Sequence, residues 1–180
     1  EPIETIYLGG GTPSQLAKED FEAIFSHIYK VYKVTPNAEI TLEANPDDLT
    51  SEYISMLRTF PFNRISMGIQ TFQETTLKQL QRRHTADQAI RAFQGCRTAG
   101  FQNISIDLMY GLPGETLTSW KKDLKQALSL HPEHISAYHL IYEEGTPLWK
   151  LREQHKVEEA DEDLSVSLFG TLIDELTTAG

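Results

Sequence analysis

"TIYLGGGTPS", residues 5–14, alternates polar and apolar residues and then places three consecutive glycines before Thr-Pro-Ser. The alternation predicts a β-strand, and Thr12 followed by Pro13 is typical of the start of a helix. A tight strand-to-helix turn usually requires only one glycine, because only one residue takes positive φ. Three glycines leave two interpretations open: a turn alone, or a turn with a ligand lying against its backbone where a Cβ would be in the way.

The same succession of strand and helix repeats along the chain. Patterns typical of strands occupy residues 5–9, 39–44, 64–70, 103–111 and 134–142. Patterns typical of helices occupy residues 15–33, 50–59, 74–81, 86–99, 117–130, 147–155 and 161–178. Strands joined by helical crossovers predict a parallel α/β sheet. A closed eight-stranded barrel takes about 250 residues, so this pattern predicts an open, partial (β/α) barrel or a doubly wound sheet.

The composition favours one globular domain that binds a small molecule or a protein. The chain has 180 residues, 39% of them hydrophobic, and a net charge of −10. That charge argues against binding to nucleic acid or to an anionic membrane surface. The sequence has no apolar run of the roughly 20 residues that span a bilayer and no basic start typical of a signal peptide, so we expect a cytoplasmic protein.

Residues that fit neither an apolar core nor a solvated surface gather where the predicted strands end, which is where parallel α/β folds bind ligands. They are Gly9 to Thr12, Glu43, Asn45, Gly68, Gln70, Asp107, "YGLPGET" (110–116) and "YEEGTP" (142–147). Glu43 and Asp107 interrupt apolar strands, where a buried carboxylate is costly without a donor. The donors could be the strand-end backbone, Arg82 or Arg83, or a ligand with an ammonium group or vicinal hydroxyls.

Other features favour structural interpretations. "GLPGET" is typical of a Pro-Gly turn into a helix, and Asp47 and Asp48 suit the positive end of a helix dipole. Cys96, the single cysteine, lies in the middle of a predicted helix and indicates packing, so the chain alone offers no disulfide and no all-cysteine metal site. Three histidines within nine residues raise the question of zinc, but their spacing fits no helical pair of ligands: His131, His134 and His139.

Taken together, six ordered motifs resemble the radical S-adenosylmethionine (SAM) proteins of the oxygen-independent coproporphyrinogen III oxidase family. The motifs are "GGGTPS", "LEANPDD", "RISMGIQTF", "LQRRH", "IDLMYGLPGET" and "AYHLIYEEGTP". The resemblance implies that seven residues bind S-adenosylmethionine: Gly10, Gly11, Thr12, Glu43, Gln70, Arg82 and Asp107. It implies that the glycine loop lines the ligand through its backbone, that Glu43 binds the ammonium group or a ribose hydroxyl, and that Arg82 binds a carboxylate. Gln70 and Asp107 would contact other polar atoms, and the oxidase holds two S-adenosylmethionine molecules.

The family also binds a [4Fe–4S] cluster through a CxxxCxxC motif after its first barrel strand, and this chain has only Cys96. We therefore expect residues 1–180 to be an incomplete radical SAM core, with the first strand and cluster loop upstream and a further domain downstream. In the family the cluster supplies the electron that cleaves S-adenosylmethionine to a 5′-deoxyadenosyl radical. The chain by itself is expected to be catalytically silent.

Within the family, "QRRH" and "YEEGTPLW" resemble the heme-chaperone branch more than the oxidase. The resemblance implies a protein that binds heme, a [4Fe–4S] cluster and S-adenosylmethionine, and that passes heme to an acceptor protein. The alternative is the oxidase itself, which decarboxylates a porphyrinogen in heme biosynthesis. A radical enzyme that modifies tRNA is a weaker third hypothesis, because an RNA partner favours a basic surface.

Overall fold

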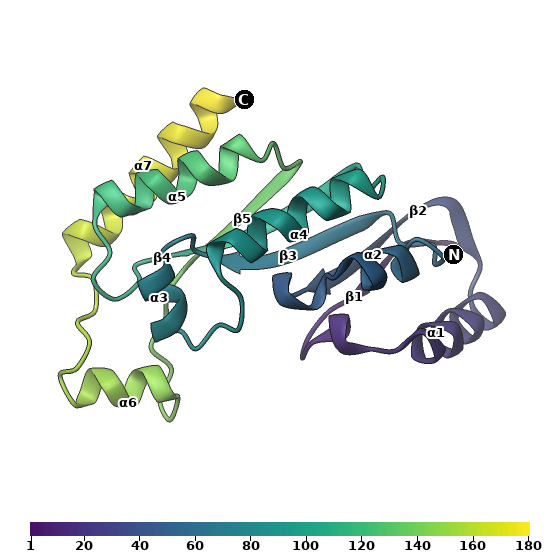
Figure 1. Ribbon diagram of the computed structural model, residues 1–180, viewed down its shortest axis with the longest axis horizontal. Coiled ribbons are helices and arrows are strands. Elements are labelled where there is room, and N and C mark those ends of the chain that lie inside the picture. The colour runs from purple at the N-terminus through teal and green to yellow at the C-terminus, as the bar shows by residue number, and fades with distance from the viewer.

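The computed structural model describes all 180 residues, as a single sheet covered by helices (Figure 1). The strands are β1 (Ile3–Leu8), β2 (Val34–Ala44), β3 (Arg64–Gln70), β4 (Asn103–Tyr110) and β5 (His134–His139). The α-helices are α1 (Lys18–Val31), α2 (Ser51–Leu57), α3 (Glu74–Gln79), α4 (Ala86–Thr98), α5 (Leu117–Ser129), α6 (Pro147–Glu153) and α7 (Glu162–Ala179). Two short 3-10 helices, η1 (Pro13–Gln15) and η2 (Pro46–Asp48), follow β1 and β2.

The sheet decides between the two predicted architectures. Its strands are all parallel and lie in chain order, β1-β2-β3-β4-β5. A doubly wound sheet reverses its strand order at a switch point, and this sheet has no reversal. The prediction of an open, partial (β/α) barrel is therefore confirmed, and β1 and β5 form the two edges of the sheet within this chain.

The two faces of the sheet differ in chemistry because side chains alternate along a strand. The outward-facing residues are apolar and fully buried against the helices: Leu42, Ile65, Met67, Ile69, Ile104, Ile106 and Leu108. Trp120 of α5 is also fully buried in this core, and its indole N–H donates to the carbonyl of Leu168 in α7 over 3.0 Å. The residues at the alternate positions face inward, and they include Glu43, Ser66 and Asp107. The inner, concave face of the sheet is therefore polar.

Several element boundaries differ from the sequence predictions. The helix predicted over 15–33 is divided, because the chain is extended at Leu16 and Ala17 between η1 and α1. Strand β2 begins at Val34, five residues before the predicted start, because the segment before residue 39 also pairs with the beginning of β1. Strand β5 ends at His139, and the predicted continuation to residue 142 leaves the sheet.

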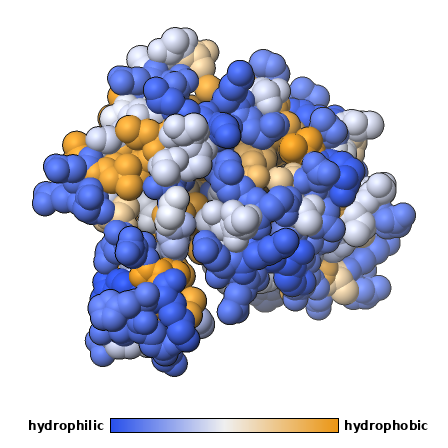
Figure 2. Space-filling model, turned by 60° about the vertical axis from the view of Figure 1, so that its left-hand side comes forward, coloured by the Kyte–Doolittle hydropathy of each residue, from blue (hydrophilic) through white to orange (hydrophobic).

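A small second apolar cluster lies apart from the main core. It consists of buried Leu112, Leu140 and Tyr142, against which Trp149 of α6 packs. Helix α6 stands off from the sheet in Figure 1, and Figure 2 shows a lobe at the lower left whose outer surface is largely polar. No helix of the chain combines the length and apolar character needed to cross a bilayer.

Candidate functional site

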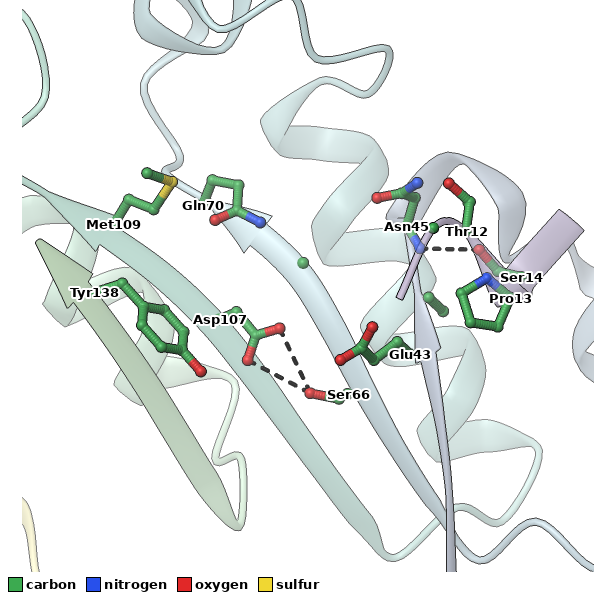
Figure 3. A pocket seen from close by; sticks show the side chains of 13 residues that line it. Thr12, Pro13, Ser14, Glu43, Asn45, Ser66, Gln70, Asp107, Met109 and Tyr138 are labelled. Carbon is green, nitrogen blue, oxygen red and sulfur yellow. Dashed lines mark hydrogen bonds between the residues drawn. The ribbon is translucent and has the colours of Figure 1, made fainter. Parts of the chain in front are cut away.

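The carboxyl ends of the strands surround one polar cleft on the concave face of the sheet (Figure 3). Its volume is about 360 Å³, which falls within the range of small-molecule sites. The lining residues come from every strand end: Gly11, Thr12, Pro13, Ser14, Glu43, Ala44, Asn45, Ser66, Gly68, Gln70, Asp107, Met109 and Tyr138. Five of the seven residues predicted to bind ligand are among them, and only Gly10 and Arg82 are not.

The three glycines have separate structural reasons. Gly10 and Gly11 have φ values of +78° and +64°, a left-handed conformation that L side chains rarely adopt, and a Cβ on either would meet open space. A Cβ on Gly9 would lie 2.5 Å from Tyr7 Cε1 and 2.8 Å from Glu43 Cδ. The expectation that one positive φ suffices is therefore wrong here. The close neighbours of the loop are side chains of the chain itself, and the open space at Gly10 and Gly11 leaves room for a ligand.

Glu43 finds two donors within the chain. Its Oε1 accepts a hydrogen bond from the Tyr7 hydroxyl over 2.7 Å, and its Oε2 accepts one from the backbone N–H of Gly10 over 2.9 Å. The strand-end backbone was one of the predicted donors, whereas Tyr7 was not anticipated. Partial burial and the Glu43 carboxylate raise the pKa of Tyr7 to about 12, so Tyr7 remains a donor at neutral pH.

Asp107 is less well satisfied than Glu43. Its carboxylate is half-buried, and the Ser66 hydroxyl lies 3.4 and 3.5 Å from its two oxygens. Burial raises the pKa of Asp107, and the hydroxyls of Ser136 and Ser66 offset only part of that rise. The negative charge of Glu43 raises the pKa further. A cationic ligand between the two carboxylates would reverse this effect by favouring their charged forms.

Neither predicted arginine reaches these carboxylates. Arg82 donates from one Nη to the side-chain oxygen of Asn45 over 2.7 Å and to the carbonyl of Gly68 over 2.9 Å. Its Nε is buried without a partner. Arg82 therefore supports the ends of β2 and β3 from outside the cleft lining, and the interpretation of Arg82 as a donor to Glu43 or Asp107 is wrong.

Arg83 instead pairs with the acidic residues after β2. One Nη lies 2.9 Å from Asp47 Oδ2 and 3.0 Å from Asp48 Oδ1. The other oxygen of Asp48 accepts a 2.6 Å hydrogen bond from Ser14, whose hydroxyl in turn accepts one from the backbone N–H of Asn45. Asp47 and Asp48 thus do more than begin a helix. They connect the glycine loop and the segment around Arg83 to the end of β2.

Sequence reasoning missed several lining residues, chiefly Ser66, Met109 and Tyr138. Side chains alternate along a strand, so residues an even number of positions apart on one strand lie on the same face. Ser66 and Met109 are related in this way to predicted site residues on β3 and β4, and Tyr138 of β5 is paired in register with Met109. Ser66 is two residues before Gly68, and Met109 is two residues after Asp107. Strand parity was the available signal, whereas the exposed ring of Tyr138, which lies beside Asp107 in Figure 3, required the sheet register.

The three histidines considered as zinc ligands have different surroundings. His134 Nδ1 is 2.9 Å from the Ser105 hydroxyl, and His139 Nε2 is 3.1 Å from the Ser165 hydroxyl. His139 also packs edge-on against Tyr110. His131 has a left-handed backbone, with φ of +52°, and no group of three or more metal-ligating side chains occurs in the structure.

The loop "GLPGET" after β4 forms the predicted turn into α5, and its central feature is Glu115. The Glu115 carboxylate accepts from the backbone N–H groups of Gly111 and Leu112 over 2.6 and 3.3 Å. Burial nevertheless raises the pKa of Glu115 to about 7, more than these hydrogen bonds lower it. Protonation of Glu115 is therefore easier in the folded chain than in the unfolded one.

This raised pKa predicts a pH-dependent stability. The folded chain binds the Glu115 proton more tightly, so the contribution of this group is present below about pH 4.5 and is lost as pH rises toward about 7. At about 1.4 kcal/mol for each pH unit between the two pKa values, the loss approaches about 3 kcal/mol. Glu115→Gln keeps an acceptor and should flatten this decline in urea unfolding between pH 4.5 and 7. An identical slope in both proteins would contradict the assignment to Glu115.

Comparison with known proteins identifies the family. Residues 1–127 match the family model of the radical SAM superfamily. The chain belongs to the radical SAM superfamily. It is 35% identical over 179 residues to the heme chaperone HemW of Bacillus subtilis, covering 99% of this chain and 47% of that protein. It is 37% identical over 180 residues to HemW of Lactococcus lactis, and the match covers 100% of this chain and 48% of that protein. The chain thus spans about half the length of these radical SAM relatives.

The fold is also that of a solved radical SAM enzyme. The structure of coproporphyrinogen III oxidase (HemN) from Escherichia coli superimposes with a TM-score of 0.84 and 26% identity, covering 98% of this chain and 41% of that one. Membership of the superfamily implies S-adenosylmethionine and a [4Fe–4S] cluster. The resemblance to the coproporphyrinogen oxidase-like family is confirmed by these matches.

The cleft fits S-adenosylmethionine, whereas the residues of this chain do not fit a [4Fe–4S] cluster. S-adenosylmethionine carries a sulfonium and an ammonium group, and no salt bridge joins Glu43 or Asp107 to a Lys, Arg or His that would compete for them. Cluster ligation needs several thiolates, whereas this chain has one cysteine, Cys96, which is fully buried in the core. Burial raises the pKa of its thiol to about 12. These residues supply no cluster site.

Proposed function

We propose that this chain binds S-adenosylmethionine in the cleft at the carboxyl ends of its strands, as part of the radical SAM core of a heme chaperone. The observation that carries the proposal is the pair of half-buried carboxylates, Glu43 and Asp107, facing one cavity without a basic partner. Beside them the chain turns at Gly10 and Gly11 with open space next to the backbone. A cationic ligand with polar termini would satisfy both features.

Each site residue has a role in this proposal that its geometry permits. Glu43, held by Tyr7 and by the Gly10 amide, accepts from the ammonium group or a ribose hydroxyl. The backbone of Gly10 to Thr12 lines the methionyl part, and Gln70 and Asp107 bind further polar atoms. Arg82 acts by fixing Asn45 and Gly68, two residues that line the cleft, through one Nη of its guanidinium.

The choice of a heme chaperone over an oxidase rests on the relatives and on two motifs. The relatives from Bacillus subtilis and Lactococcus lactis are both named heme chaperones. The motif "QRRH" contributes Arg82 and Arg83 beside the cleft. The motif "YEEGTPLW" contributes Tyr142, which is buried in the second apolar cluster, and Trp149, which is partly buried against it. Heme is then the cargo, and an acceptor protein is its destination. The likeness to HemN supports the oxidase as the second candidate.

Turnover separates these two functions, because both would share the S-adenosylmethionine contacts. The protein expressed from its complete reading frame should be reconstituted anaerobically with iron and sulfide, given coproporphyrinogen III, a reductant and S-adenosylmethionine, and assayed for protoporphyrinogen. Heme should be titrated in parallel by absorbance. We expect saturable heme binding without product formation. Steady product formation above a no-enzyme control would overturn the chaperone assignment and favour the oxidase.

A further inference from the structure

Gln70, the last residue of β3, has an unusual backbone in the middle of the candidate site. Its φ is +71°, in the left-handed region that residues with a side chain rarely occupy. The ladder between β3 and β4 is irregular at the same point, because Gly68 pairs with Asp107 and Gln70 with Leu108. Such conformations persist only where the surroundings hold them. Some part of the chain must therefore hold Gln70, whose side chain lines the cleft (Figure 3).

A buried carboxylate holds the residues immediately after Gln70. Asp123, in the middle of α5, is fully buried and accepts from three donors of the next turn. These are the Thr71 hydroxyl, the Phe72 backbone N–H at 3.2 Å and the Gln73 side-chain amide at 2.8 Å. The Thr71 hydroxyl also accepts from the Gln73 backbone N–H over 3.0 Å, which closes the turn on itself.

The residue before Gln70 is linked to the residue after it, because the Thr71 backbone N–H donates to the Ile69 carbonyl over 2.9 Å. Ile69 and Gly68 also have partners of their own. The Ile69 carbonyl lies 3.1 Å from His84 Nε2, and the Gly68 carbonyl accepts from Arg82 over 2.9 Å. The chain is thus held on both sides of Gln70 by elements that follow it in sequence. Only the side after Gln70 depends on a buried acidic group.

Asp123 needs an explanation because an apolar residue would serve the core at this position. Burying a carboxylate is costly unless donors satisfy it, and none of its three donors belongs to α5 or to another helix. All three lie in the turn 71–73, which fixes where β3 ends. The carboxylate therefore acts on the geometry of that turn.

We propose that Asp123 is a positioning residue, which holds the turn 71–73 so that Gln70 keeps its left-handed backbone and presents its side-chain amide to the ligand in the cleft. This inference rests on the proposed binding of S-adenosylmethionine. It makes affinity depend on a side chain that lies in the core behind the sheet and does not line the cleft.

The first test is Asp123→Asn, which keeps the shape but presents an N–H group where a donor now points. We expect amide exchange at Phe72 to accelerate at least about tenfold, and S-adenosylmethionine affinity, measured by calorimetry on this chain, to fall about tenfold. The control is Ile54→Val, a core truncation in α2 that should leave both quantities unchanged. Unchanged exchange at Phe72, or unchanged affinity with binding otherwise intact, would overturn the inference.

A double-mutant cycle separates positioning from general destabilisation. If Asp123 acts through Gln70, adding Asp123→Asn to Gln70→Ala should cost no further affinity. Additive losses would overturn the inference. Should Asp123→Asn fail to fold, Thr71→Val removes one donor and Thr71→Ser restores it, so only the serine variant should bind normally. Absence of binding by the unsubstituted chain would instead overturn the proposed function, while the exchange result would still report on the turn.

Discussion

Replacing Glu43 with alanine is expected to weaken S-adenosylmethionine binding by about 1.5–3 kcal/mol, or about 10- to 150-fold. The expected loss is large because the carboxylate would make a charge-assisted bond to the ammonium group. Glu43 is also already oriented, since the Tyr7 hydroxyl and the Gly10 amide hold its two oxygens. Calorimetric titration of the chain with S-adenosylmethionine measures the effect.

Two further variants make the Glu43 experiment specific. Glu43→Gln retains the shape and should lose nearly as much affinity, because the charge is what the ammonium group recognises. Glu39→Ala removes an exposed carboxylate from the same strand, four residues before Glu43 and on the same side of the sheet. It should leave affinity unchanged. Binding by Glu43→Ala within twofold of the unsubstituted chain would contradict the assigned role.

Gly9→Ala is expected to remove most of the affinity for S-adenosylmethionine, with only a small effect on the stability of the fold. Gly9 is not left-handed, so alanine can adopt its backbone conformation. The added Cβ would lie 2.5 Å from the Tyr7 ring and 2.8 Å from the Glu43 carboxyl carbon. Both are ends of side chains that can move, and Tyr7 is 56% exposed, so we expect the unfolding free energy to fall by only about 1–2 kcal/mol.

The displaced carboxylate is what makes Gly9→Ala harmful to binding. Moving Glu43 separates it from the Gly10 amide, so affinity should fall at least about tenfold, approaching the loss for Glu43→Ala. The matched control is Gly170→Ala in α7, where a Cβ meets open space. It should leave binding unchanged and stabilise the helix by up to about 1 kcal/mol. Normal binding by Gly9→Ala would show that this contact does not position Glu43.

The sequence alone determined the alternation of elements and the place of the cleft. Strand and helix periodicities are local properties, and parallel strands bring their carboxyl ends to one edge whatever their order. Glu43, Gln70 and Asp107 could therefore be assigned to one cleft from their positions in the predicted strands. The resemblance added S-adenosylmethionine, and the single cysteine showed that the cluster ligands are not in this chain.

Only the tertiary structure decided how these residues are held. The choice between a partial barrel and a doubly wound sheet depends on strand order, which periodicity does not encode. The partners of Arg82 and Arg83, and the burial of Asp123 against Thr71, join residues about 35 to 52 positions apart in the chain. Such contacts form because packing the helices onto the sheet brings distant polar groups together and removes them from water, so each must find a donor or acceptor there.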